Sequence, residues 1–125
     1  MSKKMFYIER ILAIVAAFIL LQTLYFKFIG AKESVDLFTR LGIEPWGRYV
    51  TAVLELFAGI FLLLPRKALV GAGLAIVVMV GALLSHIFIL GFSGSDSSLA
   101  LLAGIVLLCS MIVFSIRKKQ QLKAS

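Results

Sequence analysis

Residues 46–64 read WGRYVTAVLELFAGIFLLL, a run that opens on a tryptophan and is dominated by apolar residues. A helix needs ~20 residues to cross the ~30 Å hydrocarbon layer of a bilayer, and this run approaches that length. Three further apolar runs occupy residues 11–29, 68–92 and 99–116. The sequence therefore predicts an all-α membrane protein, a bundle of four transmembrane helices formed by residues 1–125 as a single domain.

The amino-acid composition supports a lipid environment for these runs. Apolar residues make up 62% of the 125-residue chain, whereas soluble domains contain roughly 45–50%. A soluble domain this short has too little interior to bury so much apolar surface. A membrane β-barrel is not expected, because the runs lack the alternation of polar and apolar residues that barrel strands show.

Basic residues are distributed unevenly between the two sides that this topology defines. One side carries nine of them, namely Lys3, Lys4, Arg10, Arg66, Lys67, Arg117, Lys118, Lys119 and Lys123. The other side carries Lys32, Arg40 and Arg48, together with Glu33, Asp36, Glu44 and Asp96. Basic residues in short loops mark the cytoplasmic face, so both termini are expected in the cytoplasm, at the inner membrane of a bacterium. This distribution also accounts for the net charge of +7, so no nucleic-acid partner is expected.

The segment between the first two runs, residues 31–44, reads AKESVDLFTRLGIE and is not a simple loop. Apolar residues recur every three positions from Val35, with charged residues between them, which predicts a short amphipathic helix on the outer interface. Gly42 is a natural end for this helix, and Trp46 is expected at the headgroup level. In the last loop, residues 91–98 (GFSGSDSS) are expected to cap the fourth helix with a side-chain oxygen.

Small residues four positions apart are candidates for close helix packing. Such pairs are Ala13–Ala17, Gly71–Ala75, Gly81–Ser85 and Ala100–Gly104. Chance is the alternative, because glycine and alanine are common in membrane helices. The single cysteine, Cys109, cannot form an intrachain disulfide and is expected to be an apolar residue facing the core or lipid. With His86 as the single histidine, no zinc site and no bis-histidine haem are expected in one chain.

Lys27, Arg48, Glu55 and His86 are the charged residues and the histidine inside the runs. Arg48 is expected at the headgroup level, which leaves Lys27, Glu55 and His86 inside the membrane. Such residues cost several kcal/mol when they face lipid, so they usually face a partner or a cavity. A rise of ~1.5 Å per residue puts Glu55 near the middle of the membrane and the other two in its outer half. The helix periodicity places further polar residues on shared faces with them. The predicted outer-half pocket, a ligand site or a buried polar cluster, thus comprises Lys27, Glu55, His86, Arg48, Thr51, Gln22 and Thr23.

Each of these residues also has a purely structural interpretation. Lys27 could extend its ammonium to the headgroups, and Glu55 could form a structural ion pair with Lys27 or Arg48. His86 could simply hydrogen-bond to a neighbouring helix. Arg10 is expected to mark the cytoplasmic boundary of the first span, and the inner half of the bundle is expected to be almost wholly apolar. No catalytic residue and no metal ligand is predicted.

Several short motifs follow the order found in one family of four-helix membrane proteins. They are Glu9-Arg10-Ile11, Phe26-Lys27-Phe28, Arg40-Leu41-Gly42-Ile43, Leu54-Glu55-Leu56-Phe57-Ala58-Gly59 and Leu83-Leu84-Ser85-His86. In these motifs the chain resembles the DoxX and DoxX-like family. Many members have a glycine three residues before the lysine, where this chain has Leu24, so a close helix contact is not implied there.

The resemblance implies a limited set of functions. Family members are similar to small subunits of quinone-linked membrane oxidoreductases, which implies an accessory subunit that binds a lipophilic ligand, for example a quinone, and has no independent catalytic activity. Distant relatives look like a chaperone for receptor assembly, so an assembly factor for another membrane protein is the alternative. A small transporter or proton path is a third, less favoured hypothesis. The expected partners are the lipid bilayer, a lipophilic small molecule, and a membrane protein or a second copy of the chain.

Overall fold

The computed structural model describes residues 2–90 and 95–124. The elements in this part are α1 (Lys3–Phe28), α2 (Lys32–Arg40), α3 (Trp46–Leu63), the 3₁₀ turn η1 (Pro65–Lys67), α4 (Ala68–Ser85), the π-helical η2 (His86–Leu90) and α5 (Ser95–Ala124). Four of the helical segments are long and apolar enough to cross a membrane. The prediction of an all-α bundle with four spans is confirmed.

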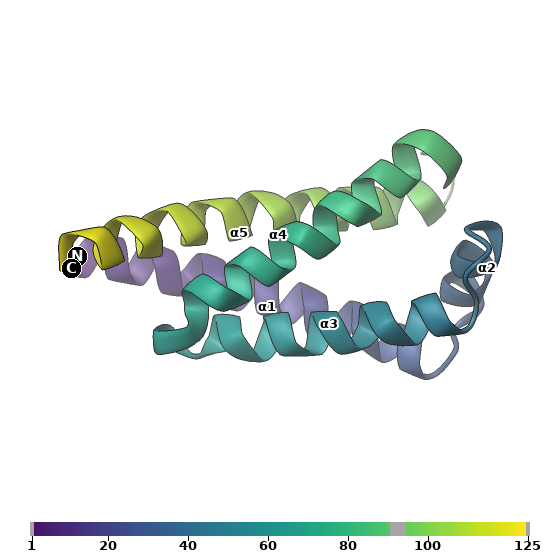
Figure 1. The fold of residues 1–125 in the computed structure, drawn as a ribbon, viewed down its shortest axis with the longest axis horizontal. Coiled ribbons are helices and arrows are strands. Elements are labelled where there is room, and N and C mark those ends of the chain that lie inside the picture. Colours follow the sequence, from purple (N-terminus) through teal and green to yellow (C-terminus); the bar gives the residue numbers. More distant parts are fainter. Residues whose placement is uncertain (1, 91–94, 125) are drawn as a thin grey trace.

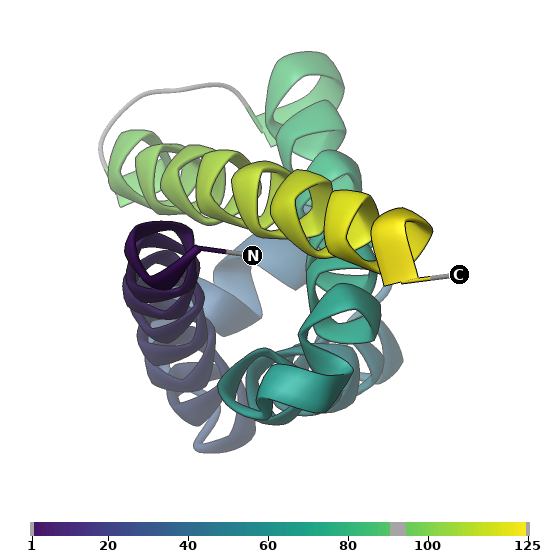
Figure 2. The ribbon, with the colours of Figure 1, turned by 90° about the vertical axis from the view of Figure 1, so that its left-hand side faces the viewer.

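The four long helices form a ring, in which α1 and α4 each contact both α3 and α5 (Figure 2). Both termini lie at one end of the bundle, which we call the terminal end (Figure 1). The short helix α2 lies at the opposite end, which we call the α2 end, and contacts α1, α3 and η2. The ring therefore differs at its two ends, since α2 is present at one of them only.

Two long helices extend beyond the apolar runs that predict them. α1 begins at Lys3 instead of residue 11, because the Ser2 side chain accepts a hydrogen bond from an amide of the first turn. α5 continues to Ala124 instead of residue 116, since the lysines and glutamines of the tail are good helix formers. The predicted cap of the fourth span depends on residues 91–94 and on side chains at 95–98, which lie outside the described residues.

The amphipathic helix predicted within residues 31–44 is present as α2. It ends at Arg40, and Gly42 follows with a φ of 77°, a left-handed conformation that glycine adopts without steric cost. Phe38 on its apolar face is 6% exposed and points into the bundle. α2 thus contributes apolar side chains to the interior at this end.

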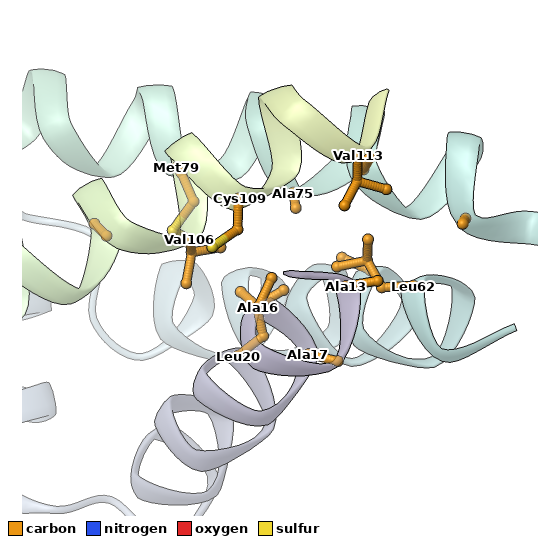
Figure 3. Packing of buried hydrophobic residues seen from close by; sticks show 14 residues of the cluster. Ala13, Ala16, Ala17, Leu20, Leu62, Ala75, Met79, Val106, Cys109 and Val113 are labelled. Atoms are coloured by element: carbon orange, nitrogen blue, oxygen red, sulfur yellow. The ribbon is translucent and has the colours of Figure 1, made fainter. Parts of the chain in front are cut away.

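The core is built largely from small residues, which allow the helices to approach closely (Figure 3). Ala13, Ala16 and Ala17 of α1 are fully buried, and larger side chains such as Leu20 and Val106 fill the space between helices. The predicted placement of Cys109 as an apolar residue is consistent with its position in this core. Large apolar side chains elsewhere face outward on all four long helices, as expected for a lipid-facing surface.

The small-residue pairs predicted from the sequence do not all make close contacts with a neighbouring helix. At Gly71 a Cβ atom would lie 2.6 Å from the backbone nitrogen of Leu62, so this glycine lets α4 touch the α3 backbone. At Gly81 and Gly104 a Cβ atom would meet nothing within 4 Å. The predictions of close contacts at Gly81 and Gly104 are therefore wrong, because these two positions face open space.

Candidate functional site

A buried carboxylate on α3 is the centre of the polar residues inside the bundle. Glu55 is 1% exposed, and its Oε1 atom lies 2.7 Å from Nζ of Lys27 on α1. Its Oε2 atom lies 2.6 Å from the Thr23 hydroxyl, which also lies 2.9 Å from the Leu20 carbonyl oxygen. Thr23 and Lys27 reach the same carboxylate because residues four apart lie on one face of a helix.

His86 lies at the point where α4 changes into the π-helical η2. Its side chain is 3% exposed. A π-helical turn widens the helix locally, and such turns are frequent at functional sites. The imidazole is therefore buried at the end of α4, whereas Glu55 is buried near the middle of α3.

A cavity of about 390 Å³ lies between these groups. Its walls come from α1, α2, α3, α4, η2 and α5, and most of the lining side chains are apolar. The polar side chains in its lining are those of Thr23, Lys27, Ser34, Thr51, Glu55, Ser85 and His86. Leu37, Phe38 and Leu41 line it from α2 and the residue after it.

The predicted pocket residues divide into those that line the cavity and those that do not. Thr23, Lys27, Thr51, Glu55 and His86 line it. Gln22 is exposed on the outside of α1 and does not reach it. Arg48, the seventh predicted residue, has a different role.

Arg48 holds the end of α1 in place instead of lining the cavity. It is 6% exposed, although the sequence suggested a position at the headgroups. Its Nε atom donates to both carboxylate oxygens of Glu44, at 2.9 and 3.0 Å, and its Nη1 atom donates to the Lys27 carbonyl oxygen. The Lys27 oxygen also accepts from the Gly30 amide at 3.3 Å, so the arginine adds a second, charged donor to a carbonyl in the last turn of α1. Glu44, its partner, is a residue that the sequence analysis missed.

A second polar cluster lies at the terminal end, where an almost wholly apolar interior was expected. Glu9 is fully buried and forms ion pairs with Arg10 and with Arg117 of α5. Arg10 also donates to the Leu63 carbonyl oxygen at 3.3 Å, and Arg117 to Gln120 at 3.2 Å. The expectation of an apolar inner half is therefore wrong. One signal was available, because Glu9 is the only acidic residue before Glu33.

The cavity can accept a molecule that combines an apolar body with a hydrogen-bonding group. Sites for small molecules commonly have volumes of ~300–1,000 Å³, with apolar walls and a few convergent polar groups. The Lys27 ammonium has three N–H donors, and the Glu55 contact occupies at most part of that capacity. Among the described residues, no group of three or more histidine, cysteine or acidic side chains could hold a metal ion.

Comparison with known proteins identifies the family of this chain. No curated protein and no solved structure matches it. A family model described as the DoxX-like family matches residues 11–115, which include the cavity lining, the second and third spans and most of the first and fourth spans. The chain is an integral membrane protein that belongs to the DoxX-like family.

Proposed function

We propose that this protein is a membrane-embedded accessory subunit of a quinone-linked redox system, and that the cavity beside Lys27 and Glu55 binds the quinone. The observation that carries the proposal is a cavity of about 390 Å³ in which a buried ion pair lies among mostly apolar side chains. A quinone has an apolar ring and carbonyl oxygens that accept hydrogen bonds. Lys27 would donate to a carbonyl oxygen, and the apolar side chains would contact the ring.

The chain would bind and position the quinone, and a partner subunit would exchange electrons with it. The sequence has one cysteine and one histidine, too few for a dithiol pair or a bis-histidine haem within one chain. The residues at the cavity are hydrogen-bond donors and acceptors, a set suited to holding a carbonyl compound in one orientation.

The proposed location is the inner membrane of a bacterium, with the terminal end in the cytoplasm. The nine basic residues assigned to one side by the sequence lie in the segments 3–10, 66–67 and 117–123. These segments include both ends of the chain and the η1 turn. Short cytoplasmic segments carry such an excess of lysine and arginine. In this orientation the cavity lies in the outer half of the membrane.

The proposal is tested by titrating the purified protein in lipid nanodiscs with a short-chain ubiquinone analogue. The informative variant replaces the pair, Lys27→Met with Glu55→Met, because an apolar replacement of both partners usually preserves folding. Loss of a hydrogen bond from a charged donor is worth ~1.5–3 kcal/mol, so the affinity should fall by roughly tenfold or more.

Gln22→Leu is the matched control, since Gln22 lies on the same helix as Lys27 but outside the cavity. It should bind the analogue as the unmodified protein does. The proposal fails if the unmodified protein does not bind the analogue, or if the double variant binds it with unchanged affinity.

A further inference from the structure

The cavity has a side opening between α3 and α4. Four of its lining residues are also exposed on the outer surface of the bundle, and three of them lie on these two helices: Leu54 on α3, which is 37% exposed, Val77 on α4, which is 70% exposed, and Gly81 on α4. The fourth is Ile43, between α2 and α3, which is 48% exposed. Glu55 and His86, which line the same cavity, are almost completely buried. Most of the exposed lining residues therefore lie on α3 and α4, whereas these two polar residues are buried.

The path of the two helices explains why the opening is there. Near η1 they are in close contact, because Gly71 packs against the backbone of Leu62. From that point α4 diverges from α3 toward the α2 end (Figure 1). Leu54, Val77 and Gly81 lie on the diverging parts, within segments apolar enough to span a membrane. The opening therefore faces the hydrocarbon layer.

Gly81 lies at the α4 edge of this opening. A glycine inside a helix is less favourable than alanine, so a packing reason is usual. Here none is found, since a Cβ atom at this position would meet nothing within 4 Å. The nearby Ser85 hydroxyl donates to the Gly81 carbonyl oxygen at 2.9 Å. Gly81 therefore adds no side chain to the side of the opening that α4 forms. The Ser85 hydroxyl donates its hydrogen bond within α4.

We infer that the gap between α3 and α4 is a lateral passage for the hydrocarbon tail of the ligand, and that the ligand enters from the acyl-chain layer. This inference rests on the proposed function and specifies its ligand class: an amphiphile with one compact hydrogen-bond-accepting head and a long unbranched or isoprenoid tail. The head lies at Lys27, and the tail passes Gly81 and Val77 into lipid. A compact polar molecule without a tail would leave the passage unoccupied.

The test compares a tailless ubiquinone analogue with a decyl-tailed one in nanodiscs, using Gly81→Trp to fill the passage. The indole should block the path of the tail, so that a tailed analogue can no longer place its head at Lys27. We expect the affinity for the tailed analogue to fall at least about tenfold, and that for the tailless analogue to stay within about twofold.

Val80→Trp is the matched control, because Val80 is a lipid-exposed neighbour on the same helix that does not line the cavity. It should bind both analogues as the unmodified protein does. If Gly81→Trp binds the tailed analogue with unchanged affinity, the passage is overturned while the cavity proposal stands. If the unmodified protein binds neither analogue, the proposed function itself fails. A photoreactive group at the tail end provides a second measurement, and cross-links confined to helices other than α3 and α4 would also overturn the passage.

Discussion

Two buried glutamates, Glu9 near the terminal end and Glu55 near the middle of α3, are stabilised in different ways. Glu9 is fully buried between two guanidinium groups, from Arg10 and Arg117. Glu55 has one ammonium group and one hydroxyl as partners and lines a cavity. A buried carboxylate is costly unless it is paired and hydrogen-bonded, and both residues meet that condition. The first arrangement is suited to holding helices together, and the second leaves one side open to a ligand.

Replacing Glu9 should destabilise the fold. In Glu9→Gln the two arginines lose the charge that both of them contact, and they face each other inside the protein. Removing one member of a buried ion pair usually costs 3–5 kcal/mol, so we expect the free energy of unfolding to fall by about 3 kcal/mol. Reversible unfolding in mixed micelles, followed by circular dichroism, measures this change.

Lys118→Gln is the control for this variant, because Lys118 is an exposed neighbour of Arg117. Exposed charges contribute at most about 1 kcal/mol to stability, so it should unfold almost as the unmodified protein does. Equal stability of both variants would contradict the assignment of Glu9 as the residue that joins α1 and α5.

At the scale of elements, the contact between α3 and α4 determines the shape of the cavity. The two helices are closest at Gly71, where a Cβ atom would also lie 2.9 Å from the carbonyl carbon of Phe61. Because those neighbouring atoms belong to the backbone, they cannot move aside as the end of a side chain can. This contact fixes one end of the helix pair, and the divergence beyond it leaves room for the cavity.

Gly71→Ala should therefore destabilise the protein, whereas Gly73→Ala should not. Overpacking of a close contact typically costs about 1–3 kcal/mol. At Gly73 the nearest atom to a new Cβ is 3.6 Å away, on the Phe114 ring, which is an ordinary contact distance. Alanine is the better helix former, so Gly73→Ala should gain about 0.5–1 kcal/mol. Thermal unfolding of the two variants side by side distinguishes these outcomes, and equal transition temperatures would contradict the close contact.

The sequence predicts the elements better than it predicts their contacts. The long apolar runs predict the spans because hydrocarbon requires helices of a certain length. Spacing also brings Thr23 and Lys27 to one face, but it does not reveal which glycine meets a neighbour: Gly71 does and Gly81 does not. The pairing of Glu9 with Arg117 could not be predicted, because the two residues are 108 positions apart and only the tertiary fold brings them together.

At the scale of the whole molecule, the two ends of the bundle carry different charges and different structures. The terminal end contains both chain termini and the Glu9 cluster, and the α2 end contains the cavity and the amphipathic helix. The distribution of basic residues supports a cytoplasmic terminal end. The orientation of the chain therefore decides from which side of the membrane the α2 end is reached.

Cysteine labelling in intact cells tests this orientation. In a Cys109→Ala background, Lys32→Cys on α2 should react with a membrane-impermeant maleimide added outside spheroplasts. Lys123→Cys at the end of α5 should react only after the membrane is permeabilised, since both positions are exposed and differ in the side they face. The reverse pattern would show the opposite orientation, and labelling of both in intact spheroplasts would contradict the bundle topology.

The polar contacts at the terminal end determine where on the protein a fluorescent probe can report that the cavity is filled. Glu9 and Arg10 tie α1 to α5 and to the last turn of α3, so three of the four spans are fastened together there. Fluorophores attached to the two termini should therefore keep a constant separation when the cavity is filled. The single tryptophan, Trp46, starts α3 at the opposite end and is largely exposed. The unlabelled protein thus carries its own optical reporter at the end of the bundle where the proposed ligand would bind.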